Sequence, residues 1–549
     1  MAAAEPKQAR KIFSSANAAT DDYANRKVPR TWSWSYWGIM LPITGGGTAG
    51  FWLAFGPALA ATYGTPNVLI GLGYAIVAQT ILGYFLVSAS ARTRLSSDLA
   101  TRGLGMGYMG SLATNLVYMV NWFFYWALES EILGSGLASY LGIPPQVGWL
   151  IVGVVVFIPL TLYGMVFVTR FQNWTIPIFV LWLGYNVFFI FHNPAAAARA
   201  QGFLSYMPTG QHVGFVPVLG AIASINGLVA VIPLLSMEFA RFAPTNRSPR
   251  SQFWGYLGIA ALPQNVPTWW IYLPIGILLW RVTGSSNPGI AFVTLTGWIG
   301  FVGLFVTQIR INLQNTYAES MSLSTIFARV FHWAPGRAFW STVTCLVGTA
   351  LIFVNMLAYI NQVLAVVGVF LFVWCGILVA DYAIVRGRMK LDVGAIEHRR
   401  AYLRVVNPIG LRSFILGAVV GLFLLYAPNL GILHGAVGST LAGVASFCGM
   451  AVALVSHALL ARRYTRSARN PYLARQPESV PAGQLNDSGL IRCVKCHVAV
   501  ESDDVARCPV QKFGWLCSEC CAADSTCGTR CQVAGVTFPS LVPVEIPSS

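Results

Sequence analysis

Long apolar runs recur along the chain, and short polar stretches separate them. About twelve of these runs reach the roughly 20 residues that an α-helix needs to cross a hydrocarbon core. We place them at residues 34–62, 67–91, 106–141, 147–169, 173–192, 213–240, 253–282, 289–327, 338–358, 360–385, 411–428 and 434–461. The pattern predicts an all-α polytopic membrane protein.

Basic residues between the runs indicate the orientation. They precede the first run and follow every even-numbered run, whereas the opposite loops contain almost none apart from Arg199 and Arg281. By the positive-inside rule, both termini are predicted to be cytoplasmic, which requires an even number of spans. The predicted organisation is a cytoplasmic tail (1–30), a transmembrane domain (31–462), a polar linker (463–490), a cytoplasmic Cys-rich module (491–532) and a short tail (533–549).

The composition supports this class and excludes others. Hydrophobic residues make up 56% of the chain and charged residues 10%, against about 25% charged in a typical soluble domain. The net charge of +16 does not indicate nucleic-acid binding, because the basic residues are spread between the apolar runs. We find no nucleophile–base constellation and no nucleotide-binding motif, so the sequence predicts neither an enzyme nor an ATP-driven pump.

Two spans contain glycines near their middle. The first contains three in a row and the sixth contains an Asn-Gly pair: Gly45, Gly46, Gly47, Asn226 and Gly227. Glycine tolerates backbone conformations that unwind a helix, and unwound segments offer backbone groups to a substrate or ion. We therefore predict that both spans are interrupted at a binding site. The alternative is that glycine is simply common in transmembrane helices.

The eighth span carries a stripe of polar side chains. Gln308, Asn312, Asn315 and Glu319 are spaced by four, three and four residues, which places them on one helix face. Burying them is costly unless they face partners or a hydrated cavity. We predict a cavity, and the alternative is a hydrogen-bonded seam between helices.

The third span carries an aromatic stripe that includes a carboxylate. Trp122, Trp126 and Glu129 recur at helical spacing, and Asn115 and Tyr118 continue the stripe upstream. Flat rings beside hydrogen-bonding groups suit a planar heterocycle. The alternatives are core packing and an interfacial aromatic belt.

Four motifs along the span region resemble one transporter family. They are R-T-W-S-W-S-Y-W-G before the first span, S-M-E-F-A-R-F-A at 236–243, N-L-Q-N-T-Y-A-E-S at 312–320 and G-I-L-V-A-D-Y-A-I-V-R at 376–386. Residues 28–465 thereby resemble the nucleobase–cation symporters of the cytosine, purine, allantoin and hydantoin permease type.

The resemblance implies a leucine-transporter-like fold, in which an inverted repeat of five plus five helices is followed by two more. It also implies that a flat heterocycle binds between spans one, three, six and eight, and that sodium or protons drive uptake. Asn315 would hydrogen-bond the substrate, and Trp122 or Trp126 would stack on it.

The chain departs from the family pattern at two places. Leu228 and Val229 follow Gly227 where the family often has a tryptophan, which puts the substrate in doubt. Ile309 and Arg310 replace the small hydroxyl residues that sodium-coupled members carry before the span-eight asparagine. We hypothesise that Arg310 takes the place of a coupling sodium, and that transport is uncoupled or is driven by protons carried on Glu129 or Glu319. An ordinary snorkelling arginine is the alternative.

The C-terminal segment contains eight of the eleven cysteines. They are Cys493, Cys496, Cys508, Cys517, Cys520, Cys521, Cys527 and Cys531. Two C-x-x-C pairs are typical of zinc sites, because two thiolates on a tight turn can grip one tetrahedral ion. We predict structural zinc, with ligands sufficient for two ions. An iron–sulfur cluster is less favoured by the spacing, and disulfides are disfavoured in the cytoplasm.

Two functions fit these features. The first is a secondary carrier in the cytoplasmic (inner) membrane that imports a nucleobase-like heterocycle. The second is a receptor-like permease whose ligand occupancy is relayed by the Cys-rich module to a cytoplasmic protein partner. Deleting residues 480–549 separates them, because a carrier keeps uptake whereas a receptor keeps binding and loses its output.

Overall fold

A computed structural model provides the structure of the chain. It describes residues 23, 25–161, 165–265, 267–331, 333, 335–466 and 471–524. Helices dominate this part of the chain, and the only strands described lie in the Cys-rich module. The fold class predicted from the sequence is confirmed.

The helices follow the predicted apolar runs. Those of the first half are α2 (Tyr36–Gly47), α3 (Gly50–Tyr63), α4 (Thr65–Thr93), α5 (Ser97–Thr101), α6 (Leu112–Leu141), α7 (Pro145–Leu150), α8 (Phe157–Thr161), α9 (Met165–His192), α10 (Pro194–Ala200) and α11 (Phe215–Ala240). Those of the second half are α12 (Pro249–Ala261), α13 (Leu273–Thr283), α14 (Pro288–Thr296), α15 (Trp298–Val330), α16 (Arg337–Ile352), α17 (Ile360–Val379), α18 (Pro408–Tyr426), α19 (Gly435–Gly443) and α20 (Ala445–Arg466).

Six helices of the described chain are long and apolar enough to cross a membrane, and the bent pair α2–α3 makes a seventh span. Other predicted spans are less uniform. The helices α6 and α15 have 30 and 33 residues but carry buried polar side chains. The span at 147–169 begins as α7 and α8 joined by a π-helical turn, and α12 and α13 share the span at 253–282. The polar and broken spans are those in which a transport site is expected.

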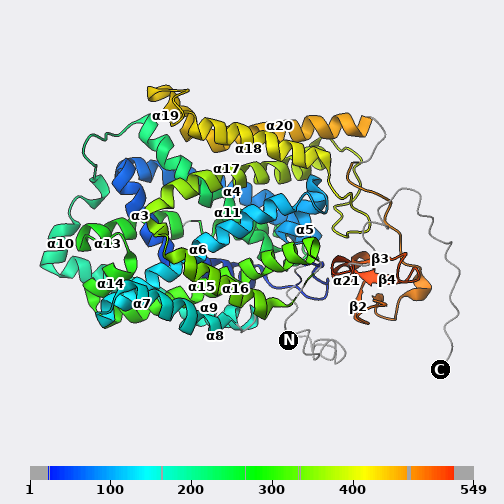
Figure 1. Ribbon diagram of the computed structural model, residues 1–549, viewed down its shortest axis with the longest axis horizontal. Coiled ribbons are helices and arrows are strands. Elements are labelled where there is room, and N and C mark those ends of the chain that lie inside the picture. The colour runs from blue at the N-terminus through cyan, green and yellow to red at the C-terminus, as the bar shows by residue number, and fades with distance from the viewer. Residues whose placement is uncertain are drawn as a thin grey trace.

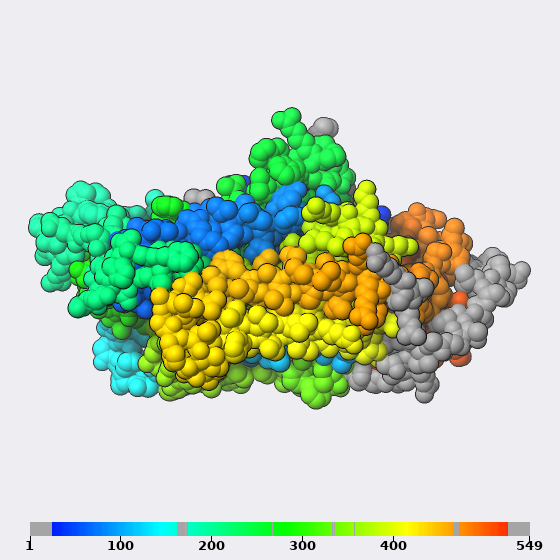
Figure 2. All heavy atoms as spheres, turned by 90° about the horizontal axis from the view of Figure 1, so that it is seen from above, coloured from blue at the N-terminus to red at the C-terminus, as the bar shows by residue number. Residues whose placement is uncertain are grey.

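The helices run roughly along the long axis of the molecule (Figure 1), and α18 and α20 lie side by side on one face (Figure 2). Inside the bundle, α4 packs along α11 and α6 packs along α15. The Cys-rich module lies at one end, next to the chain before α2 (Figure 1). We call this end, formed by residues 23 and 25–34, the end of α11 and the start of α6, the module face.

The first span is broken as predicted, but the sixth is not. The helix α11 runs without interruption through Asn226 and Gly227. A Cβ on Gly227 would lie 2.6 Å from the carbonyl oxygen of Leu364, so this glycine allows α17 to approach closely. The Asn226 side chain accepts a hydrogen bond from the Tyr74 hydroxyl at 2.7 Å. The prediction of a break here was wrong because packing against α17 uses the glycine while the helix stays intact.

The polar segment after α20 is held against the permease. Tyr472 and Leu473 are buried, and the amide of Ala474 donates to the Tyr402 carbonyl at 2.8 Å. The Tyr472 hydroxyl donates to Asp381, at the end of the tenth span. The described part of the predicted linker therefore anchors the module to the transmembrane domain.

The module contains two small antiparallel hairpins and one short helix. Strands β1 (Leu490–Arg492) and β2 (Ala499–Glu501) pair with each other, as do β3 (Val505–Arg507) and β4 (Trp515–Cys517), and α21 (Ser518–Ala522) follows. Its core is small and includes four cysteines together with Trp515 and Leu516. So small a core makes folding dependent on further cross-linking, which a metal can supply.

Candidate functional site

The centre of the candidate transport site is the break in the first span. Helix α2 ends at Gly47 and α3 begins at Gly50, and the two are bent by 51°. The first amides of a helix have no partner within it. Here the Gly50 amide donates to Gln308 Oε1 at 3.0 Å, and the Phe51 amide lies 3.2 Å from both carboxylate oxygens of Glu129. Side chains from the third and eighth spans thus cap α3.

Glu129 and Gln308 are also bonded to each other. Gln308 Nε2 donates to Glu129 Oε2 at 2.6 Å and to the Glu129 carbonyl at 3.0 Å. Both residues are buried. A carboxylate at a helix N-terminus interacts favourably with the helix dipole. The structure therefore brings together three predicted features. They are the break in the first span, the carboxylate of Glu129 in span three and the side-chain amide of Gln308 in span eight.

The glycines before the break make room for side chains of the seventh span. A Cβ on Gly46 would lie 2.3 Å from Gln264 Nε2, and one on Gly47 would lie 3.1 Å from both Gln264 and Thr268. Gln264 Nε2 donates to the Ile43 carbonyl at 2.6 Å. Gly45, Gly46 and Gly47 themselves form the last turn of α2, and the unwinding begins after them.

Arg310 lies at the same break, on another side of α15. Its guanidinium donates to the Thr48 hydroxyl, to Thr307 Oγ1 at 3.1 Å and to Thr175 Oγ1 at 3.5 Å. It also lies over the Phe179 ring, 5.2 Å from the ring centre. Within the described chain it forms no ion pair and is fully buried. A fixed positive charge is therefore surrounded by hydroxyl groups from spans one, five and eight.

Two predicted residues of span eight, with one of span three, form a hydrogen-bonded seam between α6 and α15. Trp126 Nε1 donates to Thr316 Oγ1 at 2.9 Å, and Asn312 Nδ2 donates to Ser130 Oγ at 2.7 Å. Asn315 Nδ2 in turn donates to Asn312 Oδ1 at 3.0 Å. All of these side chains are buried. In this conformation they form a hydrogen-bonded seam between two helices. This is the alternative to a hydrated cavity that the sequence left open for the polar stripe of span eight.

Two further predicted site residues, Trp122 and Glu319, lie outside this seam. Trp122 lies between Tyr118 and Tyr125, with edge-to-face ring contacts at 5.3 and 5.9 Å. Glu319 is fully buried, and neither of its carboxylate oxygens has a hydrogen-bond partner in the described part of the chain. An ionised carboxylate without a partner is costly in such surroundings.

A small cavity of about 30 Å³ lies between α11, α6 and α15 toward the module face. Its lining includes Asn115 and Tyr118 from the upstream part of the span-three stripe, Glu238 from α11, and Gln314 and Tyr317 from α15. Glu238 accepts hydrogen bonds from the Ser97 amide at 2.9 Å and the Ser97 hydroxyl at 2.5 Å. The other predicted binding residues are not in this lining.

The sequence reasoning missed Glu238 and Gln314 as cavity residues. Glu238 stands in the S-M-E-F-A-R-F-A motif, so the motif itself was the available signal. Gln314 lies between two residues of the predicted stripe and faces another direction. The side of α15 that carries Gln314 lines the cavity only because α11 packs where it does relative to α15.

Four cysteines form a group that can hold a metal ion. One ligand atom of each lies within 4.8 Å of the others, and the four are Cys493, Cys496, Cys517 and Cys520. Hydrogen bonds from the Cys517 and Cys520 thiols hold the pKa of Cys493 below its usual value. This is the predicted pair of C-x-x-C motifs, brought together by β1 and β4.

The remaining predicted ligands are not part of this group. Cys508 and Cys521 are buried elsewhere in the module. Cys527 and Cys531 lie outside the described residues. A second ion bound by these four stays a prediction.

Comparison with known proteins locates the fold. Two structures of Mhp1 match with 17% identity: an inward-facing one (TM-score 0.66; 81% of this chain, 94% of that chain) and a closed one with bromovinylhydantoin bound (TM-score 0.63; 82% and 96%). The second is described as a nucleobase-cation-symport-1 family transporter. A sodium-coupled sialic acid symporter matches with a TM-score of 0.54 and 14% identity over 82% of this chain and 94% of that one.

No family model and no curated protein matches the sequence. The chain has the fold of Mhp1. This fold confirms the leucine-transporter-like architecture that the four motifs implied, and it makes the chain a multi-pass membrane protein. The comparable proteins are transporters and not enzymes.

Proposed function

We propose that the chain is a secondary transporter that moves a planar nitrogen heterocycle of the nucleobase or hydantoin type across the cytoplasmic membrane by alternating access. The observation that carries this proposal is the break of the first span, where Glu129 and Gln308 cap the amides of α3. Discontinuous helices whose ends meet polar side chains at mid-membrane are the usual binding sites of such carriers. The likeness of fold to Mhp1 supports the same assignment.

The proposed route leads from the cavity at the module face to this break. Tyr118 lines the cavity and contacts the Trp122 ring, so aromatic faces continue from the cavity into the third span. Trp126, Asn312 and Asn315 become available to a substrate when α6 and α15 move apart. Glu129 and Gln308 would then present the hydrogen-bonding groups that a flat heterocycle needs at its edge.

A thermal-shift screen of the purified protein tests the substrate class. Cytosine, purines, allantoin and hydantoins are compared with sialic acid, and binding raises the melting temperature with the logarithm of ligand concentration. We expect a heterocycle to stabilise the protein and Asn115→Ala in the cavity to weaken the effect. Asn361→Ala, in a half-exposed position away from the cavity, is the matched control. Stabilisation by sialic acid alone would contradict the proposal.

We further propose that Arg310 replaces a coupling sodium ion. Its guanidinium lies among hydroxyl oxygens that would otherwise be suitable ligands for a hard cation. Protons carried on Glu129 or Glu319 would then supply the driving force, and the unpartnered carboxyl of Glu319 makes it the stronger candidate.

Uptake of the stabilising heterocycle into proteoliposomes tests this coupling. With the sodium and proton gradients set independently, we expect uptake to follow the proton gradient alone. The Glu319→Gln variant should lose that dependence while still binding substrate. Uptake that requires sodium would overturn the assignment of Arg310.

We propose that the four clustered cysteines hold one structural zinc ion on the cytoplasmic side. Four thiolates from two C-x-x-C motifs favour a tetrahedral ion. Metal analysis of the purified chain should give zinc, and Cys517→Ser should lose it. Cys448→Ser, which changes a half-buried cysteine of α20 outside the module, is the control. Visible absorption bands of an iron–sulfur cluster would contradict the assignment.

A further inference from the structure

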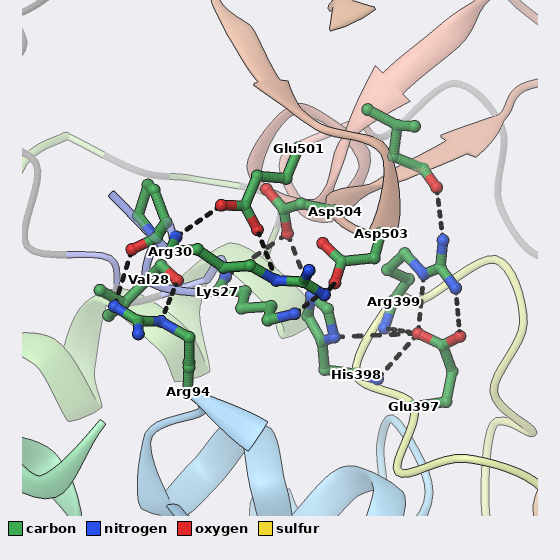
Figure 3. A network of polar contacts seen from close by, with 12 residues as sticks. Lys27, Val28, Arg30, Arg94, Glu397, His398, Arg399, Glu501, Asp503 and Asp504 are labelled. Carbon is green, nitrogen blue, oxygen red and sulfur yellow. Dashed lines mark hydrogen bonds and ion pairs between the residues drawn. The ribbon is translucent and has the colours of Figure 1, made fainter. Parts of the chain in front are cut away.

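The Cys-rich module presents an acidic edge to the N-terminal segment of the chain. Glu501, Asp503 and Asp504 face Lys27 and Arg30 (Figure 3). The Lys27 ammonium pairs with Asp503, and Arg30 lies 3.6 Å from Asp503 and 3.9 Å from Glu501. Burial raises the pKa of Asp503, but Lys27 and Arg30 outweigh this effect and hold the pKa below its usual value. The contact is therefore an ionic interface between parts of the chain more than 470 residues apart.

The N-terminal segment is itself fixed to the end of α4 and the end of α11. The Arg94 side chain donates to the carbonyl oxygens of Val28 at 3.0 Å and Pro29 at 2.7 Å. Arg241 Nη1 donates to the Tyr23 carbonyl at 3.0 Å, and Trp34 stacks on Phe242 with ring centres 4.6 Å apart. Through these contacts, Tyr23 and residues 25–34 belong to the α4–α11 side of the molecule.

The module also binds a second part of the permease, the loop at residues 397–407. His398 Nε2 lies 3.0 Å from Asp504 Oδ1, and Arg399 Nη1 donates to the Val505 carbonyl at 2.8 Å (Figure 3). Arg400 Nη1 donates to the carbonyl of Cys521 at 3.1 Å. These bonds connect the loop to β3 and to α21.

That loop is fixed to the start of α6. The amide of Tyr108 donates to the Arg404 carbonyl at 3.0 Å, and the amide of Met109 donates to the Val405 carbonyl at 2.7 Å. The Tyr108 carbonyl in turn accepts a hydrogen bond from Arg329 Nη1 of α15 at 2.7 Å. Residues 397–407 are therefore linked to the α6–α15 side. The cavity lies between this side and α11, so the module bridges the two sides at the end where the cavity is found.

We propose that the metal-loaded module is a strap across the module face, with its acidic edge as the docking surface and residues 26–30 as the occupant. Alternating access requires one group of helices to move against the other. A bridge that binds both groups must release one of them before the cavity can open fully. Loss of the metal unfolds the docking surface and so frees the cavity to open. The inference rests on the proposed transport cavity and on the proposed zinc site.

The docking is tested on the full chain in lipid nanodiscs, without any substrate. A Ser322→Cys reporter in the cavity lining is treated with a bulky maleimide, and its labelling is followed by peptide-level mass spectrometry. Hydrogen exchange of residues 25–34 is measured in parallel. The release variant is Glu501→Gln/Asp503→Asn, which keeps all four thiols. The control is Asp487→Asn, an exposed acidic residue just before the module and outside the interface.

We expect a zinc chelator and the release variant each to accelerate reporter labelling and amide exchange at least fivefold. The control should behave as the parent protein, and the release variant should retain its zinc. Unchanged labelling in the release variant, with residues 25–34 exchanging faster, would show that the segment does not restrain the cavity and would overturn the strap. Unchanged exchange in that variant would overturn the docking surface itself. Neither readout depends on the substrate, so failure of the strap is distinguishable from failure of the transport proposal.

Discussion

The first and sixth spans both carry glycine near their middle, yet only the first comes apart. In the first span, the break follows Gly47, and the amides of α3 find Gln308 and Glu129 as partners. In the sixth, Gly227 faces the backbone of α17 at Leu364, and the helix remains continuous. A glycine thus permits either a break or a close helix contact, and the neighbouring side chains decide which one forms. Without polar partners for the freed amides, a break at membrane depth would be costly.

Of the two glycine sites, the close contact at Gly227 should lose the most stability when a side chain is added. In Gly227→Val, the new side chain meets the Leu364 carbonyl, a backbone atom that cannot move aside, so α11 and α17 must separate. We expect a loss of about 2 to 3 kcal/mol in stability, seen as a lower melting temperature in detergent. Gly184→Val, on α9 where nothing lies within 4 Å, should melt like the parent protein. Equal melting of both variants would mean that α11 and α17 are not in close contact.

The cap at the first span should be next in effect. Glu129→Ala leaves the Phe51 amide buried without a partner, which costs about 2 kcal/mol. Glu129→Gln keeps a carbonyl oxygen that can accept from this amide, so it should cost less than half as much. Chemical denaturation of the two variants measures the difference. If both lose the same stability, the carboxyl group does not cap α3.

Adding a side chain to the glycines before the break should cost the least stability. A Cβ at position 46 meets the end of the Gln264 side chain, which can turn away by giving up its hydrogen bond to Ile43. We expect Gly46→Ala to cost about 1 kcal/mol. Gly73→Ala on α4, where the space is open, is the control. A larger loss than in Gly227→Val would reverse the assignment of the two glycine sites.

A large part of the fold could be predicted from the chain alone. The apolar runs located the spans, and the triple glycine located the break in α2–α3 to within a few residues. The spacing of Gln308, Asn312 and Asn315 correctly placed them on a polar helix face, but it did not distinguish a cavity from a seam. That distinction depends on which helix packs opposite, and for Asn312 this helix is α6 with Ser130.

The sequence by itself determined the membrane class, the order of the spans and the four-cysteine group, because apolar length and C-x-x-C spacing act over short stretches of chain. Only the tertiary structure decided which of the two glycine-containing spans breaks. It also decided that Glu238 lines the cavity and where the module docks. These outcomes depend on contacts between residues such as Lys27 and Asp503 or Gly227 and Leu364, which are far apart in sequence. Such contacts are set by the packing of whole helices and leave no periodic signal in the residues that make them.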